Sequence, residues 1–155
     1  MCTLINQFAS LDKVISILVK VVQSCHSQDF KQFNGKLCLI LGQRYMEKTL
    51  YTKAYSYFLR GGDVSNSVIS MKQVMKSGYH GERDLFVTRL CLEFLVRNYT
   101  KPPLAVEAAL SVIEAFKDEK KLYEAPLLNF VRILCEAIKL EGDEKTFKMI
   151  VGAYK

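Results

Sequence analysis

The sequence has no tryptophan and little glycine or proline, with eight and three residues respectively in a chain of 155. So few turn-forming residues exclude an all-β sandwich or barrel, which needs a turn about every ten residues. Apolar residues make up 50% and charged residues 25% of the chain, as in a soluble globular domain. A chain of this length buries a core without disulfides or a metal ion. We therefore expect one all-α domain over residues 1–155.

A disulfide framework and a long apolar run are also missing. The cysteines are odd in number and show no C-x-x-C spacing, which favours a reducing compartment. They are Cys2, Cys25, Cys38, Cys91 and Cys135. The apolar stretch 14–22 contains Lys20 and is shorter than the roughly 20 residues of a membrane span. We expect a cytosolic protein without a signal peptide or a membrane span.

Motifs for catalysis and cofactor binding are absent from the sequence. It contains two histidines, His26 and His80, which are too few and too far apart for a zinc site. Neither a phosphate-binding glycine-rich motif nor a nucleophile elbow occurs. We expect no enzymatic activity, no cofactor and no metal.

Apolar residues recur at spacings of three and four, the pattern of amphipathic helices. The three prolines stand at helix starts, Gly61-Gly62 and Gly142 at helix ends, and Asp143 at an N-cap. No linker divides the chain. The pattern predicts about eight helices, with approximate ranges 10–24, 35–47, 49–60, 63–78, 82–98, 103–117, 126–142 and 144–154.

One spacing is typical of a tetratricopeptide-type helical hairpin, in which small residues let two helices approach and large ones fill the gap between them. The alternative is an arbitrary helical pair, because no second clear copy of the pattern occurs. The predicted hairpin-packing residues are Leu41, Gly42, Tyr45, Ala54 and Phe58, preceded by Cys38 at the first position of the pattern. The hairpin predicts an α-solenoid of stacked tetratricopeptide-like helical pairs.

Two predicted helices, 82–98 and 126–142, have more apolar surface than one packing face requires. Neighbouring hairpins or a partner can cover the rest. Charge is uneven as well: residues 1–101 hold 14 Lys/Arg against 7 Asp/Glu, and residues 102–155 hold 8 against 9. The basic excess forms a solvated surface or attracts acidic partners or nucleic acid. Because the cations come singly along helices, we expect no specific nucleic-acid binding.

Three stretches of the sequence resemble the Golgi-to-ER traffic protein 4 family. The first is the hairpin from Gly42-Gln43-Arg44-Tyr45 to Gly62-Asp63, and the second runs from Glu82-Arg83-Asp84-Leu85-Phe86-Val87 to Leu92-Glu93-Phe94-Leu95. The third is Glu124-Ala125-Pro126-Leu127-Leu128-Asn129-Phe130, close to the family's Glu-Pro-Leu-Leu-Asn-Phe with one inserted Ala. Their order and intervals match too, from about Leu37 onwards.

The resemblance implies a noncatalytic α-solenoid scaffold that serves the targeting of tail-anchored proteins to the endoplasmic reticulum. The amino-terminal half of the family docks on the targeting ATPase and the carboxy-terminal half holds a ubiquitin-like cochaperone. Only the later part of the family is matched, so we expect a fragment or shortened homologue whose ATPase contact is indirect or absent. The candidate partner-binding residues are Phe116, Leu122, Tyr123, Leu127, Phe130 and Leu134.

Two other functions stay open at the level of sequence. A tetratricopeptide-like adaptor that binds a peptide, such as a chaperone tail, is the main alternative. Lysines and arginines at regular intervals on the inner faces of successive helices would favour this adaptor. The candidates Lys36, Arg44 and Lys72 are irregularly placed. An RNA-binding helical repeat is supported by the basic charge alone.

Overall fold

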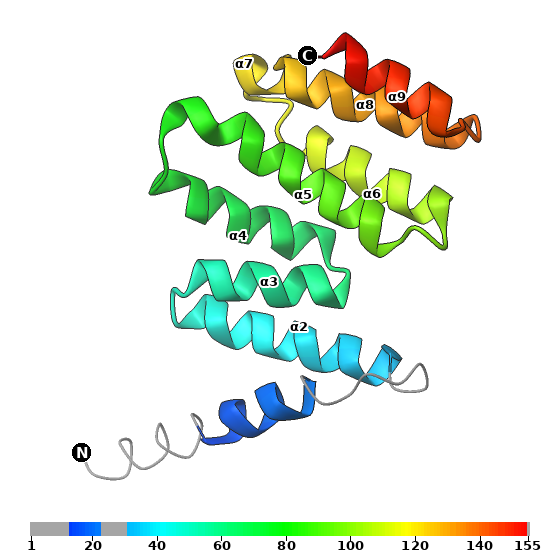
Figure 1. The fold of residues 1–155 in the computed structure, drawn as a ribbon. Coiled ribbons are helices and arrows are strands. Elements are labelled where there is room, and N and C mark those ends of the chain that lie inside the picture. Colours follow the sequence, from blue (N-terminus) through cyan, green and yellow to red (C-terminus); the bar gives the residue numbers. More distant parts are fainter. Residues whose placement is uncertain (1–12, 23–30, 155) are drawn as a thin grey trace. The chain divides into compact units, whose positions relative to one another are not determined.

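The computed structural model describes residues 13–22 and 31–154, and every regular element in these ranges is a helix (Figure 1). Contacts divide the chain into two compact units, Met1–Asp63 and Val64–Lys155, which we call the amino-terminal and carboxy-terminal units. Within each unit, consecutive helices pack on one another, as in an α-solenoid, which confirms the predicted fold class. In the described ranges, no helix combines the length and the apolar character that a bilayer crossing demands.

The amino-terminal unit contains the helix over residues 13–22, α2 (Lys31–Glu47) and α3 (Tyr51–Gly61). The core of this unit lies between the first helix and α2, because the buried residues of these two helices form one cluster. These residues are Ile15, Val22, Leu37, Cys38 and Leu41. Helix α2 corresponds to the predicted helix 35–47, but it begins at Lys31, four residues earlier than the periodicity indicated.

Helices α2 and α3 form the hairpin that the repeat spacing predicts. Leu41 and Ala54 are fully buried, and Phe58 is 1% exposed. A Cβ atom at Gly42 would lie 2.7 Å from the Phe58 ring, so glycine is required for this close approach of the helices. Tyr45 is half-buried, and its ring stacks on that of Tyr57 with 5.4 Å between centroids. Small and large residues therefore interlock as the tetratricopeptide pattern demands.

Both helices of this hairpin end in a left-handed residue. Gly62 follows α3 with a φ of 75°, and the N–H groups of Gly62 and Asp63 donate to the carbonyls of Leu59 and Phe58. This is the glycine C-cap expected from the sequence. The same hydrogen-bond pattern ends α2, but the left-handed residue there is Thr49, with a φ of 58°. A β-branched residue in this conformation is strained.

The carboxy-terminal unit is formed by six α-helices and one short 3-10 helix, η2 (His80–Glu82). The α-helices are α4 (Val64–Lys76), α5 (Arg83–Arg97), α6 (Pro102–Glu114), α7 (Lys120–Tyr123), α8 (Pro126–Lys139) and α9 (Glu144–Ala153). Helix α5 packs along α6, α8 packs against both, and α9 packs on α8. Neighbouring helices thus cover α5 and α8 on more than one side, which their apolar surfaces require.

The core of this unit is made by the inward faces of α5, α6 and α8. Fully buried residues recur at helical spacing on each, for example Leu128, Val131 and Cys135 on α8. The polar residues Asn129 and Glu136 of α8 lie away from this core and are exposed. The other fully buried core residues of α5 and α6 are Val87, Leu90, Cys91, Ala109 and Val112.

The helix ends in this unit follow the predicted signals with three differences, the first being that α6 ends at Glu114 and not near residue 117. Asp143 caps α9 as expected, since its Oδ1 accepts from the N–H of Thr146 at 2.8 Å. Helix α8 ends at Lys139 instead of Gly142, because the left-handed residue is Glu141, with a φ of 53°. The N–H of Gly142 then donates to the Ala137 carbonyl at 2.8 Å. The third difference is the single turn α7, which lies in the charged stretch that the sequence analysis left without a helix.

Candidate partner-binding surface

The turn from α7 to α8 is held by Arg132, which projects from α8. Its guanidinium lies 4.3 Å from the centroid of the Tyr123 ring. Its Nη2 donates to the Tyr123 carbonyl at 2.9 Å, and its Nη1 donates to Asn129 Oδ1 at 2.6 Å. Ala125, which precedes Pro126, has the extended backbone that proline imposes on the residue before it. These contacts fix Tyr123 beside the start of α8.

Tyr123 is half-buried and lies between α6 and α8. Its hydroxyl donates to Glu114 Oε2 at 3.4 Å. The ring also lines an open cavity of about 440 Å³, whose other lining residues are Glu107, Leu110, Ser111, Ile113, Glu114 and Arg132. Tyr123, one of the candidate partner-binding residues, is therefore accessible from this cavity.

Two of the predicted partner-binding residues lie in the core instead of on the surface. Phe116 is 1% exposed and Leu122 is 8% exposed. The ammonium group of Lys72, from α4, lies 4.7 Å from the Phe116 ring centroid and donates to the Ala115 carbonyl at 2.7 Å. Phe116 thus anchors the end of α6 inside the unit. Neither side chain offers contact area to a partner in this arrangement.

The remaining predicted residues lie on α8 and are half-buried: Leu127, Phe130 and Leu134. Helix α9 accounts for part of this burial. The Phe130 ring meets Tyr154 edge to face, with 5.3 Å between centroids and 68° between planes. An aromatic pair of this geometry is stabilising. Phe130 therefore joins α8 to the end of α9 and leaves only part of its ring for a partner.

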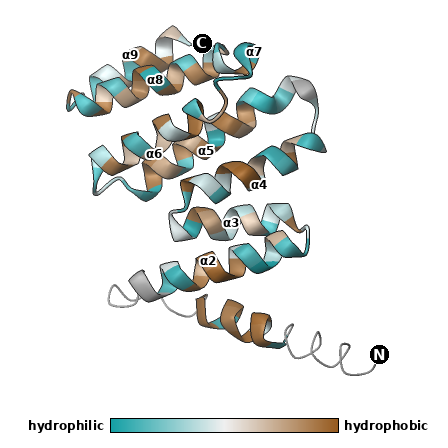
Figure 2. Cartoon of the chain, turned by 180° about the vertical axis from the view of Figure 1, so that it is seen from behind, coloured by the Kyte–Doolittle hydropathy of each residue, from teal (hydrophilic) through white to brown (hydrophobic). Residues whose placement is uncertain are grey.

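The largest exposed apolar side chains of this region are ones that the sequence analysis did not select. Figure 2 shows α8 and α9 side by side, and no residue of α9 is buried. We call the following set the α8–α9 patch: Ile133 (45% exposed), Leu140 (81%), Phe147 (47%), Met149 (69%) and Tyr154 (40%). The signal in the sequence was the presence of apolar residues on two sides of α9, at Phe147 and at Met149.

A second cavity lies between the start of α6 and the end of α8. It has a volume of about 630 Å³. Apolar residues make up most of its lining, together with three charged residues. The lining residues are Pro102, Pro103, Val106, Glu107, Leu110, Ile138, Lys139 and Glu141. Glu107 and Leu110 also line the cavity beside Tyr123, so the two cavities are neighbours along α6.

The described cysteines are structural. Cys38, Cys91 and Cys135 are buried free thiols, and Cys2 and Cys25 lie outside the described residues. Burial raises the pKa of Cys135 to about 11 and also raises the pKa of Cys91. Thiols with such raised pKa values carry almost no thiolate near neutral pH. Among residues 13–22 and 31–154, no group of three or more His, Cys, Asp or Glu is placed to hold a metal ion.

Comparison with known families agrees with the resemblance seen in the sequence. The model of the family described as Golgi to ER traffic protein 4 matches residues 1–155, including those before Leu37. No curated protein and no solved structure matches the chain. The chain therefore belongs to the Golgi to ER traffic protein 4 family, whose name implies involvement in Golgi-to-ER traffic.

Proposed function

We propose that this chain is a noncatalytic scaffold in the targeting of tail-anchored proteins to the endoplasmic reticulum, and that its carboxy-terminal unit holds a ubiquitin-like cochaperone. Membership of the family supports this proposal, as does a fold of packed helical hairpins, which commonly serves protein binding. The scaffold acts in the cytosol through protein contacts, without a cofactor or nucleic acid. Its contact with the targeting ATPase is indirect or absent.

The observation that carries the proposal is the α8–α9 patch. Helix α9 contributes no buried residue, yet Phe147 and Met149 are apolar and 47% and 69% exposed. Exposed apolar side chains of this size offer contact area to a partner, here on two sides of α9. The cavity beside Tyr123 adds a recess that can receive a side chain of the partner. The proposed surface therefore comprises the α8–α9 patch and Tyr123, with Phe130 as a residue that positions α9.

The charge of this region predicts how binding depends on salt. Residues 102–155 hold 8 Lys/Arg and 9 Asp/Glu, and several are paired, as Lys139 is with Glu136 at 2.7 Å. A surface with balanced charge gives little long-range steering. Apolar anchors then dominate the affinity, which should change less than about threefold between roughly 50 and 300 mM salt.

Isothermal titration calorimetry with the full chain and the purified amino-terminal segment of the ubiquitin-like cochaperone tests the proposal. Phe147→Glu and Met149→Glu place a charge in the patch and should each weaken binding about tenfold or more. Both side chains are exposed, so these variants should keep the helical circular dichroism spectrum of the parent. Tyr123→Ala should weaken binding less, because most of its surface is already covered by the chain.

The matched control is Ile69→Glu on α4, an apolar residue of the same unit that is 48% exposed and lies outside the proposed surface. It should bind the cochaperone segment as the parent does. If the parent chain does not bind that segment, the proposed function is wrong. If it binds and the Phe147 and Met149 variants bind equally well, the function stands and the surface is wrong.

A further inference from the structure

Helix α5 carries an open groove that the proposed function does not use. It has a volume of about 660 Å³, and all of its described lining residues come from one side of α5. The lining residues are Leu85, Thr88, Arg89, Leu92, Glu93, Val96 and Arg97. Their spacing of three and four along the chain makes a continuous stripe. The stripe from Leu85 to Val96 is about 16 Å long at the rise of an α-helix.

Three aliphatic residues run along the length of this stripe, and two of them are exposed. Leu85 is 55% exposed, Val96 is 69% exposed, and Leu92 between them is half-buried. On the opposite side of the same helix, Leu90 and Cys91 are fully buried in the core. Helix α5 therefore has one apolar side that packs inside the unit and a second apolar strip at the groove. Exposed aliphatic strips of this length are typical of surfaces that accept an amphipathic helix.

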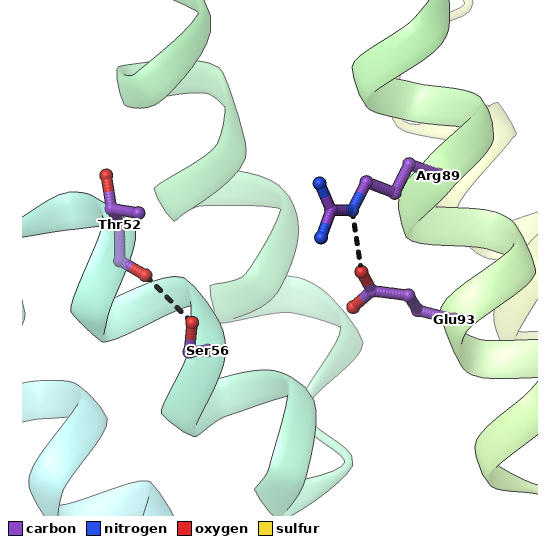
Figure 3. A network of polar contacts seen from close by, with 4 residues as sticks. All are labelled: Thr52, Ser56, Arg89 and Glu93. Carbon is purple, nitrogen blue, oxygen red and sulfur yellow. Dashed lines mark hydrogen bonds and ion pairs between the residues drawn. The ribbon is translucent and has the colours of Figure 1, made fainter.

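Charged groups border one edge of the aliphatic strip. Figure 3 shows Arg89 and Glu93 leaving α5 on the same side, and Arg89 Nε donates to Glu93 Oε1 at 2.9 Å. Arg97 continues this edge one turn further and is exposed. Two arginines and one glutamate give the edge a net positive charge. Within the carboxy-terminal unit, residues 64–101 hold 6 Lys/Arg and 3 Asp/Glu, so this part of the unit is basic as well.

We propose that the α5 groove is a docking site for an acidic amphipathic helix of another protein. Three aliphatic residues, Leu85, Leu92 and Val96, receive the apolar side of that helix. Carboxylates on its flank face Arg97, whose planar guanidinium group binds carboxylates better than lysine would. A basic helix is disfavoured because it would place like charges beside Arg97. The length of the strip corresponds to three turns, or about 11 residues, of the partner.

Fluorescence anisotropy with the full chain and two labelled 16-residue peptides tests this site. One peptide carries leucines at helical spacing and glutamates on both flanks, and the other replaces every glutamate with lysine. The acidic peptide should bind about tenfold more tightly at 50 mM salt, and the difference should shrink at about 500 mM salt. Arg97→Glu should abolish or invert this preference, and Val96→Asp should weaken binding of both peptides. Equal binding of the two peptides by the parent, or no binding of either, would overturn the proposal.

Lys148→Glu is the matched control for charge, because it makes the same change on α9, where Lys148 pairs with Glu144. It should leave the peptide preference intact. Sedimentation of the parent tests whether a second copy of the chain occupies the groove instead, and self-association that Val96→Asp abolishes would also overturn the proposal. Arg97→Glu should bind the ubiquitin-like cochaperone as the parent does, so failure of this groove and failure of the proposed function give different results.

Discussion

The hairpins α2–α3 and α8–α9 have the same turn and very different packing. In each, the first helix ends in a left-handed residue other than glycine, Thr49 or Glu141, with the same pair of backbone hydrogen bonds. Helix α3 buries Ala54, Phe58 and Leu59, whereas α9 buries no residue. The turn thus brings two helices together, but it does not decide how much surface they bury against each other.

The difference follows from side-chain size at the crossing of the helices. Gly42 on α2 lets the Phe58 ring of α3 come so close that a methyl group would not fit between them. The corresponding side of α8 carries large residues, among them Phe130, which meets Tyr154 at a ring-centroid distance of 5.3 Å. A large residue on each helix keeps the backbones apart and leaves the flanks of α9 open. We infer that the first hairpin is built for stability and the second for binding.

The largest expected effect comes from removing the close approach of α2 and α3 in the first hairpin. Gly42→Ala should lower the free energy of unfolding by about 1–3 kcal/mol, since the added methyl group overlaps the Phe58 ring. Ala54→Leu should cost a similar amount, because Ala54 is fully buried. Urea unfolding followed by circular dichroism measures both changes.

Gly35→Ala, on the same helix, is the control for Gly42→Ala. Apart from its chain neighbours and the backbone of its own helix, no atom of the described residues lies within 4 Å of a Cβ placed at Gly35. The substitution should raise the free energy of unfolding by about 0.5–1 kcal/mol, because alanine favours the helix more than glycine does. If the two variants change stability alike, the tight crossing at Gly42 is not what holds the hairpin together.

The second hairpin should depend on one aromatic contact. Phe130→Ala removes the edge-to-face pair with Tyr154 and should loosen α9 by about 1–2 kcal/mol. Hydrogen exchange of the α9 amides should accelerate about tenfold, while that of the α5 and α6 amides stays within a factor of two. Uniform acceleration through the whole unit would show that Phe130 supports the core and not α9 in particular.

Relief of strain at the two turns should stabilise both hairpins by similar, smaller amounts. Thr49→Gly and Glu141→Gly place glycine where φ is 58° and 53°, and each should raise the free energy of unfolding by up to about 1 kcal/mol. The larger gain belongs to Thr49, because a β-branched side chain is the more strained. Thermal unfolding of the two variants compares them directly, and a loss of stability in either would contradict a strained turn.

The smallest expected effect concerns the cap of α9 and its dependence on pH. Hydrogen bonds from the Thr146 N–H and hydroxyl to Asp143 lower the pKa of this carboxyl below its usual 3.8. The cap is therefore at full strength above pH 3.8 and is lost as the pH falls through the lower folded-state pKa. Exchange of the first α9 amides should accelerate there. In Asp143→Asn this pH-dependent step should be absent, and a step of unchanged size would assign it to another group.

Particular residues show how far the sequence predicts the packing. The sequence located the packing residues of the first hairpin, because a repeat pattern encodes which small residue meets which large one, as at Gly42 and Phe58. It placed Phe116 and Leu122 on the partner surface, although both are buried. An apolar residue in a charged stretch looks like a surface anchor until the helix that covers it, here α4 with Lys72, is known. Met149 was overlooked for the opposite reason, since the sequence shows apolar residues on two sides of α9 but not which of them a neighbouring helix covers.

Local features of the helices, which depend on nearest neighbours along the chain, could be predicted from the sequence. Helical periodicity, prolines at helix starts, Gly62 as a C-cap and Asp143 as an N-cap act over one or two turns, so each is readable without knowledge of the fold. Which apolar sides of the helices are covered could be seen only in the tertiary structure. Burial depends on which distant helix arrives at a surface, and α5 shows the consequence: Leu90 lies in the core and Val96 at an open groove, although both belong to the same apolar helix.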